Sequence, residues 1–346
     1  MRIGIVNQET WGFLEEIQDH LRARHAVSAY RRPRVSLPFL KERAGRLLLR
    51  RSLSDFMAAQ DVVFFEWASE LLALASRLPK RAPIVARLHR YEMYEWADRI
   101  DWDGVDAVIV VSEAKKREFC ERFPAQERKV AVVEGAVSLR KFTPSTRPFQ
   151  GDVGLLAHLT PRKRVYELIL AFARFSARNA DARLHIAGGA HPAHRDYYRA
   201  LRRLPAELGV EHRVAFYDHV DDTASWYSNI DVFVSNSYSE GLQVAPMEAL
   251  ACGKYCLSHR WEGAQELLPE SCLFWDDAEL LERLEDYWSL PPERKAEVAS
   301  EMRALAEKRF DSDRMSREVE SVLGAACRGE SPIAFRVAAP VPELPR

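Results

Sequence analysis

Several features that would place the chain in a specialised class are missing from its 346 residues. The five cysteines are scattered and form no CxxC pair, so we expect reduced thiols and no disulfide framework. No run of about 18 uncharged apolar residues occurs, and the apolar start turns polar after Val6. We therefore expect neither a membrane span nor a signal peptide. The net charge of -1 gives no indication of a nucleic-acid partner. Together these absences predict a cytoplasmic protein.

The dinucleotide fingerprint G-x-G-x-x-G is also absent, which argues against a nicotinamide-dependent enzyme. Two further patterns have the spacing of metal ligands but the wrong context. Asp101 and Asp103 precede a predicted strand, whereas a metal-binding Asp-x-Asp would follow one. His191 and His194 enclose a proline and have no third ligand nearby, which favours a polar turn. We therefore expect no metal site.

What the chain does contain is an alternation of short apolar runs and helical stretches. Continuously apolar runs are typical of parallel strands covered on both faces, so the alternation predicts an α/β protein. We expect two doubly wound, Rossmann-like domains facing a central cleft, with ligands at the carboxyl ends of the strands. The predicted strands are 2–7, 61–67, 83–89, 106–111 and 129–137, then 152–157, 183–189, 213–218, 230–237 and 254–258.

The domain boundaries follow from composition. Residues 138–150 have two prolines and little apolar content, so we predict an N-terminal domain over 1–137, a linker over 138–150 and a C-terminal domain over 151–327. Helices near 292–309 and 312–326 close the fold, and the last helix is a candidate to pack back on the N-terminal domain. The tail, 328–346, contains four prolines and is expected to be disordered.

The stretch SEGLQVAPMEALACGK, residues 239–254, is the most informative. Glu240 follows a predicted strand, and the backbone N–H groups of Gly241, Leu242 and Gln243 would crown the next helix, where an anion is favoured. Glu248, in the second turn, could reach a pair of hydroxyls. Phosphate on amides and a diol on a carboxylate suit a nucleotide sugar. The spacing alone is more typical of a solvated helix face.

A second candidate site is HLTPRKR, residues 158–164, between a predicted strand and a predicted helix. Arg162, Lys163 and Arg164 would lie at the positive end of the helix dipole, which is unfavourable unless an anion is present. A diphosphate would supply that anion. A solvated basic turn explains the three cations equally well.

These two stretches resemble the signature of the retaining glycosyltransferases of family 4, which have the GT-B fold. The matching positions are Ser237, Glu240, Gly241, Glu248, Ala249, Ala251 and Gly253. Segments 112–144, 154–175 and 180–189 extend the resemblance over nearly the whole chain. It implies an N-terminal domain that binds the acceptor and a C-terminal domain that binds the donor. It also implies that Glu248 binds the ribose hydroxyls and that Glu240 lies near the transferred sugar. Ser237 is a further donor-binding candidate.

The resemblance places an Arg and a Lys on the diphosphate of the donor. Lys163 matches the Lys, but the Arg position holds His158, and Arg162 is the candidate to compensate. Arg164 stands where the family usually has Gly. These departures leave the phosphate geometry open.

The resemblance also assigns residues to the acceptor side. The family often has a His near the end of the strand at 83–89, close to sugar and acceptor, and His89 occupies this place. A structural hydrogen bond is the alternative role for a lone His there. In the loop after the first strand, where the family commonly has two glycines, this chain has Gly12 beside Trp11.

The predicted function is that of a retaining, hexosyl-type glycosyltransferase. It would move sugar from a nucleotide-diphosphate sugar, its co-substrate, to a glycan, lipid-linked or small-molecule acceptor. We expect no metal and no other cofactor, because side chains would stabilise the leaving group. Lys163, Glu240 and His89 are the catalytic candidates. One alternative is a catalytically silent sugar-nucleotide-binding subunit, which the His158 departure favours. The other is a GT-B sugar-nucleotide epimerase.

Residues 31–51 concentrate positive charge in an otherwise balanced chain. Leucines interleave with the charges, as in a solvated helix that packs on its domain. The alternative is a patch for an anionic acceptor or for the inner face of a membrane. The basic residues are Arg31, Arg32, Arg34, Lys41, Arg43, Arg46, Arg50 and Arg51.

Overall fold

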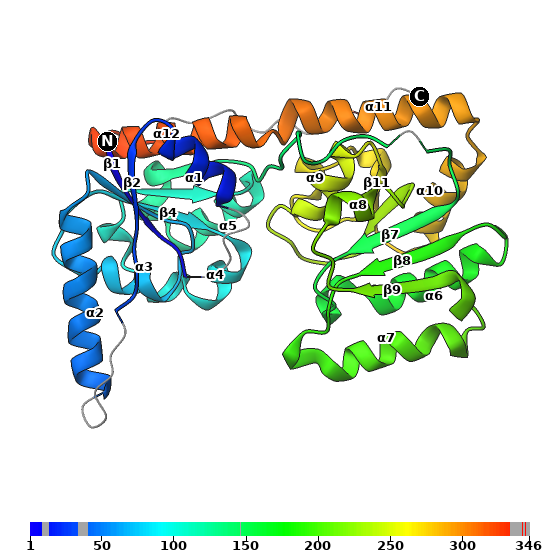
Figure 1. The fold of residues 1–346 in the computed structure, drawn as a ribbon, viewed down its shortest axis with the longest axis horizontal. Helices are drawn as coiled ribbons and strands as arrows, with labels where there is room; N and C mark the ends of the chain where they lie inside the picture. Colours follow the sequence, from blue (N-terminus) through cyan, green and yellow to red (C-terminus); the bar gives the residue numbers. More distant parts are fainter. Residues whose placement is uncertain (9–13, 34–40, 146, 333–340, 342, 344–346) are drawn as a thin grey trace. The chain divides into compact units, whose positions relative to one another are not determined.

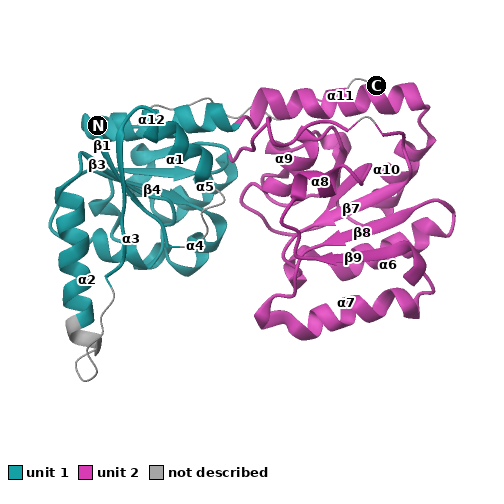
Figure 2. Ribbon diagram, viewed as in Figure 1, with its two compact units in different colours: residues 1–134, 312–338 teal, residues 135–311, 339–346 magenta. Residues whose placement is uncertain are grey.

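The computed structural model describes residues 1–8, 14–33, 41–145, 147–332, 341 and 343, with the side chains of 41–44 excepted. The chain divides into two compact units (Figure 2). Unit 1 comprises Met1–Glu134 and Ser312–Ala338, and unit 2 comprises Gly135–Asp311 and Ala339–Arg346. The division falls after Glu134, slightly before the boundary that composition suggested.

Unit 1 is built on a six-stranded parallel sheet in the order β2-β1-β3-β4-β5-β6. Figure 1 labels β1, β2 and β4 of this sheet. Strands β3, β4, β5 and β6 are buried along their whole length, which is the physical reason for their apolar sequence, with Arg87 in β4 as the exception. The strands are β1 (Arg2–Val6), β2 (Ala26–Ala29), β3 (Val62–Phe65), β4 (Ile84–Leu88), β5 (Ala107–Val110) and β6 (Val130–Val132).

The final helix of the chain belongs to unit 1. Helix α12 (Ser312–Cys327) packs along α1, and two histidines fix it there. The Nε2 atoms of His20 and His25 lie 2.6 Å and 2.8 Å from the two carboxylate oxygens of Glu320. The other helices of this unit are α1 (Glu15–Arg22), α2 (Lys41–Ala58), α3 (Glu70–Ala75), α4 (Arg90–Glu95) and α5 (Glu113–Arg122).

Unit 2 has a second six-stranded parallel sheet, in the order β12-β11-β10-β7-β8-β9. Strands β7 and β10 are neighbours at its centre, with Val153 opposite Val232. The strands are β7 (Asp152–Leu156), β8 (Arg183–Ala187), β9 (Val214–Asp218), β10 (Val232–Ser235), β11 (Tyr255–His259) and β12 (Leu273–Phe274). The helices are α6 (Val165–Ser176), α7 (Arg195–Glu207), α8 (Thr223–Tyr227), α9 (Val244–Ala251), α10 (Asp277–Ser289) and α11 (Pro292–Arg309).

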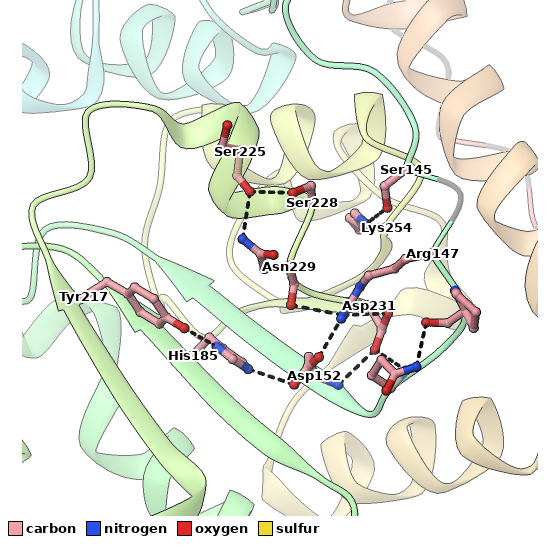
Figure 3. A network of polar contacts seen from close by, with 12 residues as sticks. Ser145, Arg147, Asp152, His185, Tyr217, Ser225, Ser228, Asn229, Asp231 and Lys254 are labelled. Atoms are coloured by element: carbon pink, nitrogen blue, oxygen red, sulfur yellow. Dashed lines mark hydrogen bonds and ion pairs between the residues drawn. The ribbon is translucent and has the colours of Figure 1, made fainter.

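The segment expected to be a linker is anchored to unit 2 through a polar network (Figure 3). The Arg147 guanidinium donates to Asp152 at 2.8 Å and to Asp231 at 3.0 Å. Asp152 also lies 2.8 Å from His185 Nε2, and the His185 Nδ1 atom lies 2.7 Å from the Tyr217 hydroxyl. Burial would raise the pKa of Asp152, but its bonds to His185 and Arg147 hold that pKa below the usual value.

The structure also bears on the fold class, the cysteines, membrane-spanning helices and the C-terminal tail. The predicted α/β class with two parallel sheets is confirmed. All five cysteines are unbridged. In the described part of the chain, no helix combines the length and the apolar character needed to cross a membrane. Most of the tail expected to be disordered lies outside the described residues, but Val341 donates its N–H to the Gln265 carbonyl at 3.3 Å.

Candidate functional site

Two loops at the carboxyl edge of the unit 2 sheet form the core of the candidate site. Since β7 and β10 are adjacent and parallel, the loops that follow them leave the sheet at the same edge. The Asn236 amide donates to the Arg164 carbonyl at 2.9 Å, and Tyr238 N–H donates to the Arg162 carbonyl at 3.3 Å. Arg162 NH1 in turn donates to the Ser239 carbonyl at 2.6 Å. These hydrogen bonds hold the loop that contains residues 162–164 against the loop that contains residues 236–239.

Where these two loops meet, one carboxylate oxygen holds two cations. Glu240 Oε1 lies 2.6 Å from Lys163 Nζ and 2.6 Å from Arg162 NH1. The side chains of Lys163 and Glu240 are each 9% exposed. Burial would raise the pKa of Glu240, but the charges of Lys163 and Arg162 and a hydrogen bond from Ser237 hold it below its usual value. The cluster is thus an ionised triad with a net charge of about +1, since two cations face one anion.

The basic turn over residues 158–164 has an acidic partner within the protein. The basic turn before α6 does have an anion, as its electrostatics required, but in the described structure that anion is Glu240. The backbone amides of residues 241–243 were expected to crown the next helix. In the structure, α9 begins at Val244 and Gln243 is its N-cap. Gly241, Leu242 and Gln243 therefore precede the first turn, and Pro246 within that turn has no N–H.

Arg164 has a strained backbone at the entrance to α6. It is the N-cap of that helix and adopts the left-handed conformation, with φ 49° and ψ 41°. A non-glycine residue in this region costs about 1–2 kcal/mol. The position where glycine is usual in the resembled family is therefore one where glycine would be favoured here as well.

Gly188 shows how closely the neighbouring loops are packed. Its φ is +137°, and a Cβ there would lie 1.7 Å from the Ala157 carbonyl oxygen. Only glycine lets the loop after β8 lie against the loop that carries His158. His158 itself is exposed. Loss of solvent around the ring and the nearby Lys163 charge lower the pKa of its imidazole, so His158 is mainly neutral at pH 7.

Glu248 lies on α9 with one carboxylate oxygen 3.0 Å from the Tyr227 hydroxyl. Tyr227 is fully buried, and its hydroxyl also lies 2.9 Å from the Ala245 carbonyl oxygen. Burial raises the pKa of this phenol further above its usual value, so it serves Glu248 as a neutral hydrogen-bonding partner. Sequence reasoning missed Tyr227, because nothing in its local sequence separates it from other core aromatic residues.

His89 belongs to unit 1, where it directly follows β4 and is the N-cap of α4. Its Nε2 atom lies 3.3 Å from Glu66 Oε1, and its ring lies 4.3 Å from the Trp67 ring between centroids. Glu66 is fully buried and also accepts from Arg87 NH1 at 3.2 Å. Sequence analysis missed Glu66, although a lone acid at the end of the apolar run VVFFEW was a usable signal. Trp11 and Gly12 lie outside the described residues.

The two patterns with metal-like spacing have structural partners. Asp101 accepts from Asp103 N–H at 3.2 Å and caps a short 3-10 helix. His191 Nδ1 accepts from the Ala193 N–H at 3.2 Å and caps the short 3-10 helix Pro192–His194. Among the residues that the structure describes, no group of three or more His, Cys, Asp or Glu could hold a metal ion.

Helix α2 carries most of the described part of the basic segment, and Arg32, which precedes the helix, pairs with Glu70 at 2.8 Å. Leu49 and Leu53 pack into the core of unit 1, while Leu47 and Leu48 are 70% and 42% exposed. Arg46, Arg50 and Arg51 are exposed next to them. Arg34 and the side chains of Lys41 and Arg43 lie outside the described residues. The described helix therefore has both a packed face and an exposed face that mixes leucine and arginine.

Family models match both halves of the chain. Residues 150–307 match the model described as "Glycosyl transferases group 1", and residues 11–141 match "Glycosyltransferase Family 4". Among curated relatives, "D-inositol 3-phosphate glycosyltransferase 2" of Catenulispora acidiphila is 30% identical over 183 residues, 46% of this chain and 42% of its own length. "D-inositol 3-phosphate glycosyltransferase" of Corynebacterium urealyticum is 26% identical over 185 residues, 49% and 44% of the two chains. The aligned part thus spans less than half of either relative.

Solved structures resemble the fold over most of the chain. Anabaena HepE in complex with UDP and glucose has a TM-score of 0.77 and 19% identity, covering 94% of this chain and all (100%) of HepE. Sucrose-phosphate synthase of Thermosynechococcus elongatus has a TM-score of 0.71 and 16% identity, covering 92% and 97% of the two chains. At such identities the likeness concerns the fold alone.

Proposed function

The chain belongs to the group 1 glycosyltransferases of family 4, which have the GT-B fold, and from this premise we propose its activity. It transfers a hexosyl group from a nucleotide-diphosphate sugar to a hydroxyl acceptor, with retention of the anomeric configuration. The donor side of the proposal is consistent with HepE, which has been solved in complex with UDP and glucose, with UDP, and with UDP-glucose.

The observation that carries the proposal is the triad in which Lys163 and Arg162 both bond to the buried carboxylate of Glu240. Two cations at the carboxyl edge of a parallel sheet, beside a helix N-terminus, suit a diphosphate. Cleavage of the anomeric bond places negative charge on that diphosphate. Preorganised cations at the position where charge develops are often the largest contribution to catalysis. Side chains thus supply the electrostatic stabilisation, and the proposed reaction needs no metal and no cofactor other than the donor.

The other site residues take supporting roles in this proposal. Glu248, oriented by Tyr227, accepts hydrogen bonds from the ribose hydroxyls. Ser237 and Glu240 orient the transferred sugar, and the segment Gly241–Gln243 leads the chain into α9 beside the phosphates. His89 acts on the sugar and acceptor side from unit 1, with its ring orientation fixed by Glu66.

The acceptor proposal rests on charge. The curated relatives are named for an inositol phosphate, and a phosphorylated acceptor suits the arginines of the segment 31–51. Exposed Leu47 and Leu48 beside exposed Arg46, Arg50 and Arg51 also suit peripheral contact with an anionic membrane, as for a lipid-linked acceptor in glycoconjugate assembly. Co-sedimentation with anionic vesicles at two salt concentrations separates the two, because a soluble acceptor requires no vesicle binding.

The test of the activity is a donor panel without assumed acceptor. Purified protein is incubated with UDP-, GDP- and ADP-sugars, and release of free sugar and nucleotide is measured with and without phosphorylated polyols. A transferase releases nucleotide, and slowly hydrolyses one donor in the absence of acceptor. Epimerisation without nucleotide release would favour an epimerase. Binding of a donor without any turnover would favour a silent subunit, which the neutral His158 at the phosphate side makes the second candidate.

A further inference from the structure

The buried carboxylate of Glu240 occupies the cations that the proposed donor would need. Both Lys163 and Arg162 bond to the same oxygen, Oε1, at 2.6 Å. Glu240 is 8% exposed, and the Arg162 side chain is 27% exposed. An anion approaching from solvent therefore meets a site whose positive charge is partly neutralised from within.

We propose that Glu240 is an internal stand-in for the donor diphosphate, which must displace it from at least one of its two cations. This inference rests on the proposed function and deepens it, because it assigns to Glu240 a role in donor selection besides contact with the sugar. In the unliganded protein, the carboxylate keeps Lys163 and Arg162 in place and satisfies their charge. When the donor binds, the phosphates take over that partnership and Glu240 turns to the sugar.

The physical reason is that neither the buried carboxylate of Glu240 nor the two cations are stable here without a partner of opposite charge. A buried ion without a partner is strongly unfavourable, so two cations facing each other with no anion would repel and shift the loops. Arg162 and Ser239, and Asn236 and Arg164, join the same two loops by hydrogen bonds. The stand-in thus preserves the shape of the phosphate site between turnovers and avoids a rearrangement at each binding event.

The arrangement also predicts selectivity for diphosphates. A single phosphate would exchange one anion for another at nearly the same place and gain little. A diphosphate brings more charge and more oxygens, so it can engage one cation directly and displace Glu240 from the other. The carboxylate of Glu240 thereby weakens the binding of every anion to this site, and it weakens the binding of small anions most.

The test uses inorganic pyrophosphate and UDP as probes, with affinities measured by calorimetry on the full chain. Glu240→Gln keeps the size and an acceptor oxygen but removes the competing charge. We expect at least tenfold tighter binding of both probes, with a steeper salt dependence, while any sugar transfer falls. Glu282→Gln, at an exposed position on α10, makes the same change in net charge and should leave both affinities within twofold. Equal or weaker binding by Glu240→Gln would overturn the inference.

A second measurement keeps the inference testable if Glu240→Gln does not fold. In a crystal structure of the wild-type chain with pyrophosphate, Glu240 should lie more than about 4 Å from Lys163 Nζ or from Arg162 NH1, beyond ion-pair distance. Persistence of both contacts would refute the stand-in role. If the wild-type protein binds pyrophosphate and Lys163→Ala does not, the proposed donor site stands whatever Glu240 does. If the wild-type protein binds no nucleotide and no pyrophosphate, the donor site and the stand-in are both wrong.

Discussion

Replacement of Lys163 by alanine should lower both stability and turnover, for reasons that can be separated. In the unliganded protein the change removes one of the two cations bonded to Glu240 and leaves its buried carboxylate with Arg162 alone. Breaking a fully buried ion pair costs about 3–5 kcal/mol. Because Arg162 remains and is partly exposed, the loss is closer to that of one charged hydrogen bond, about 1.5–3 kcal/mol.

The second effect is on chemistry. In the proposed reaction Lys163 faces the charge that develops on the leaving diphosphate, and loss of one such donor lowers kcat on the order of a hundredfold. Arg162 cannot fully replace it, since its guanidinium is also committed to the Ser239 carbonyl. Thermal unfolding followed by circular dichroism measures the first effect, with an expected loss of roughly 3–10 °C in Tm. Nucleotide release under saturating donor measures the second.

A double variant separates the two effects. Lys163→Ala combined with Glu240→Ala removes the stranded carboxylate along with its cation, so stability should recover in part while activity stays low. Wild-type turnover in Lys163→Ala would show that the triad is not the phosphate site. Stability losses of the two single variants that simply add in the double variant would show that it is not a coupled ion cluster.

Four further outcomes follow from the same structure. Arg164→Gly should raise the free energy of unfolding by about 0.5–1 kcal/mol, because it relieves a φ of 49°; an unchanged or lower Tm would contradict this. Glu248→Ala should weaken UDP binding by about 1.5–3 kcal/mol in calorimetry, and unchanged affinity would place Glu248 outside the nucleotide site. Activity should survive EDTA, and a loss that manganese restores would return Asp101 and Asp103 as ligand candidates. The pKa of Asp152 is lowered in the fold, so its stabilising effect is complete above the unfolded pKa of about 4 and is lost as pH falls further. In acid-unfolding curves, the free energy of unfolding of Asp152→Asn should therefore fall less steeply with decreasing pH than that of the wild type.

The sequence by itself determined the fold class and the position of most strands. A strand covered on both faces is mostly apolar, so its run of apolar residues, such as VVFF in β3 or AVIV in β5, can be recognised in the sequence. Strand β2, with the pattern AVSA and alternating partial exposure, has no such signature and was missed. The two-residue β12 is too short for any periodicity to develop.

The candidate site divides in a similar way. Sequence reasoning identified Lys163, Arg162 and Glu240 and recognised that the basic turn required an anion. Only the tertiary structure decided which anion this is, because the partner of a buried charge is set by the packing of two loops 77 positions apart in the chain. The same holds for the pairing of Glu66 with His89 at 3.3 Å and of Tyr227 with Glu248 at 3.0 Å, because each pairing joins residues from different elements. Burial of an element requires a pattern of apolar residues that is visible in the sequence. A hydrogen bond between distant residues depends on geometry that exists only after the chain has folded.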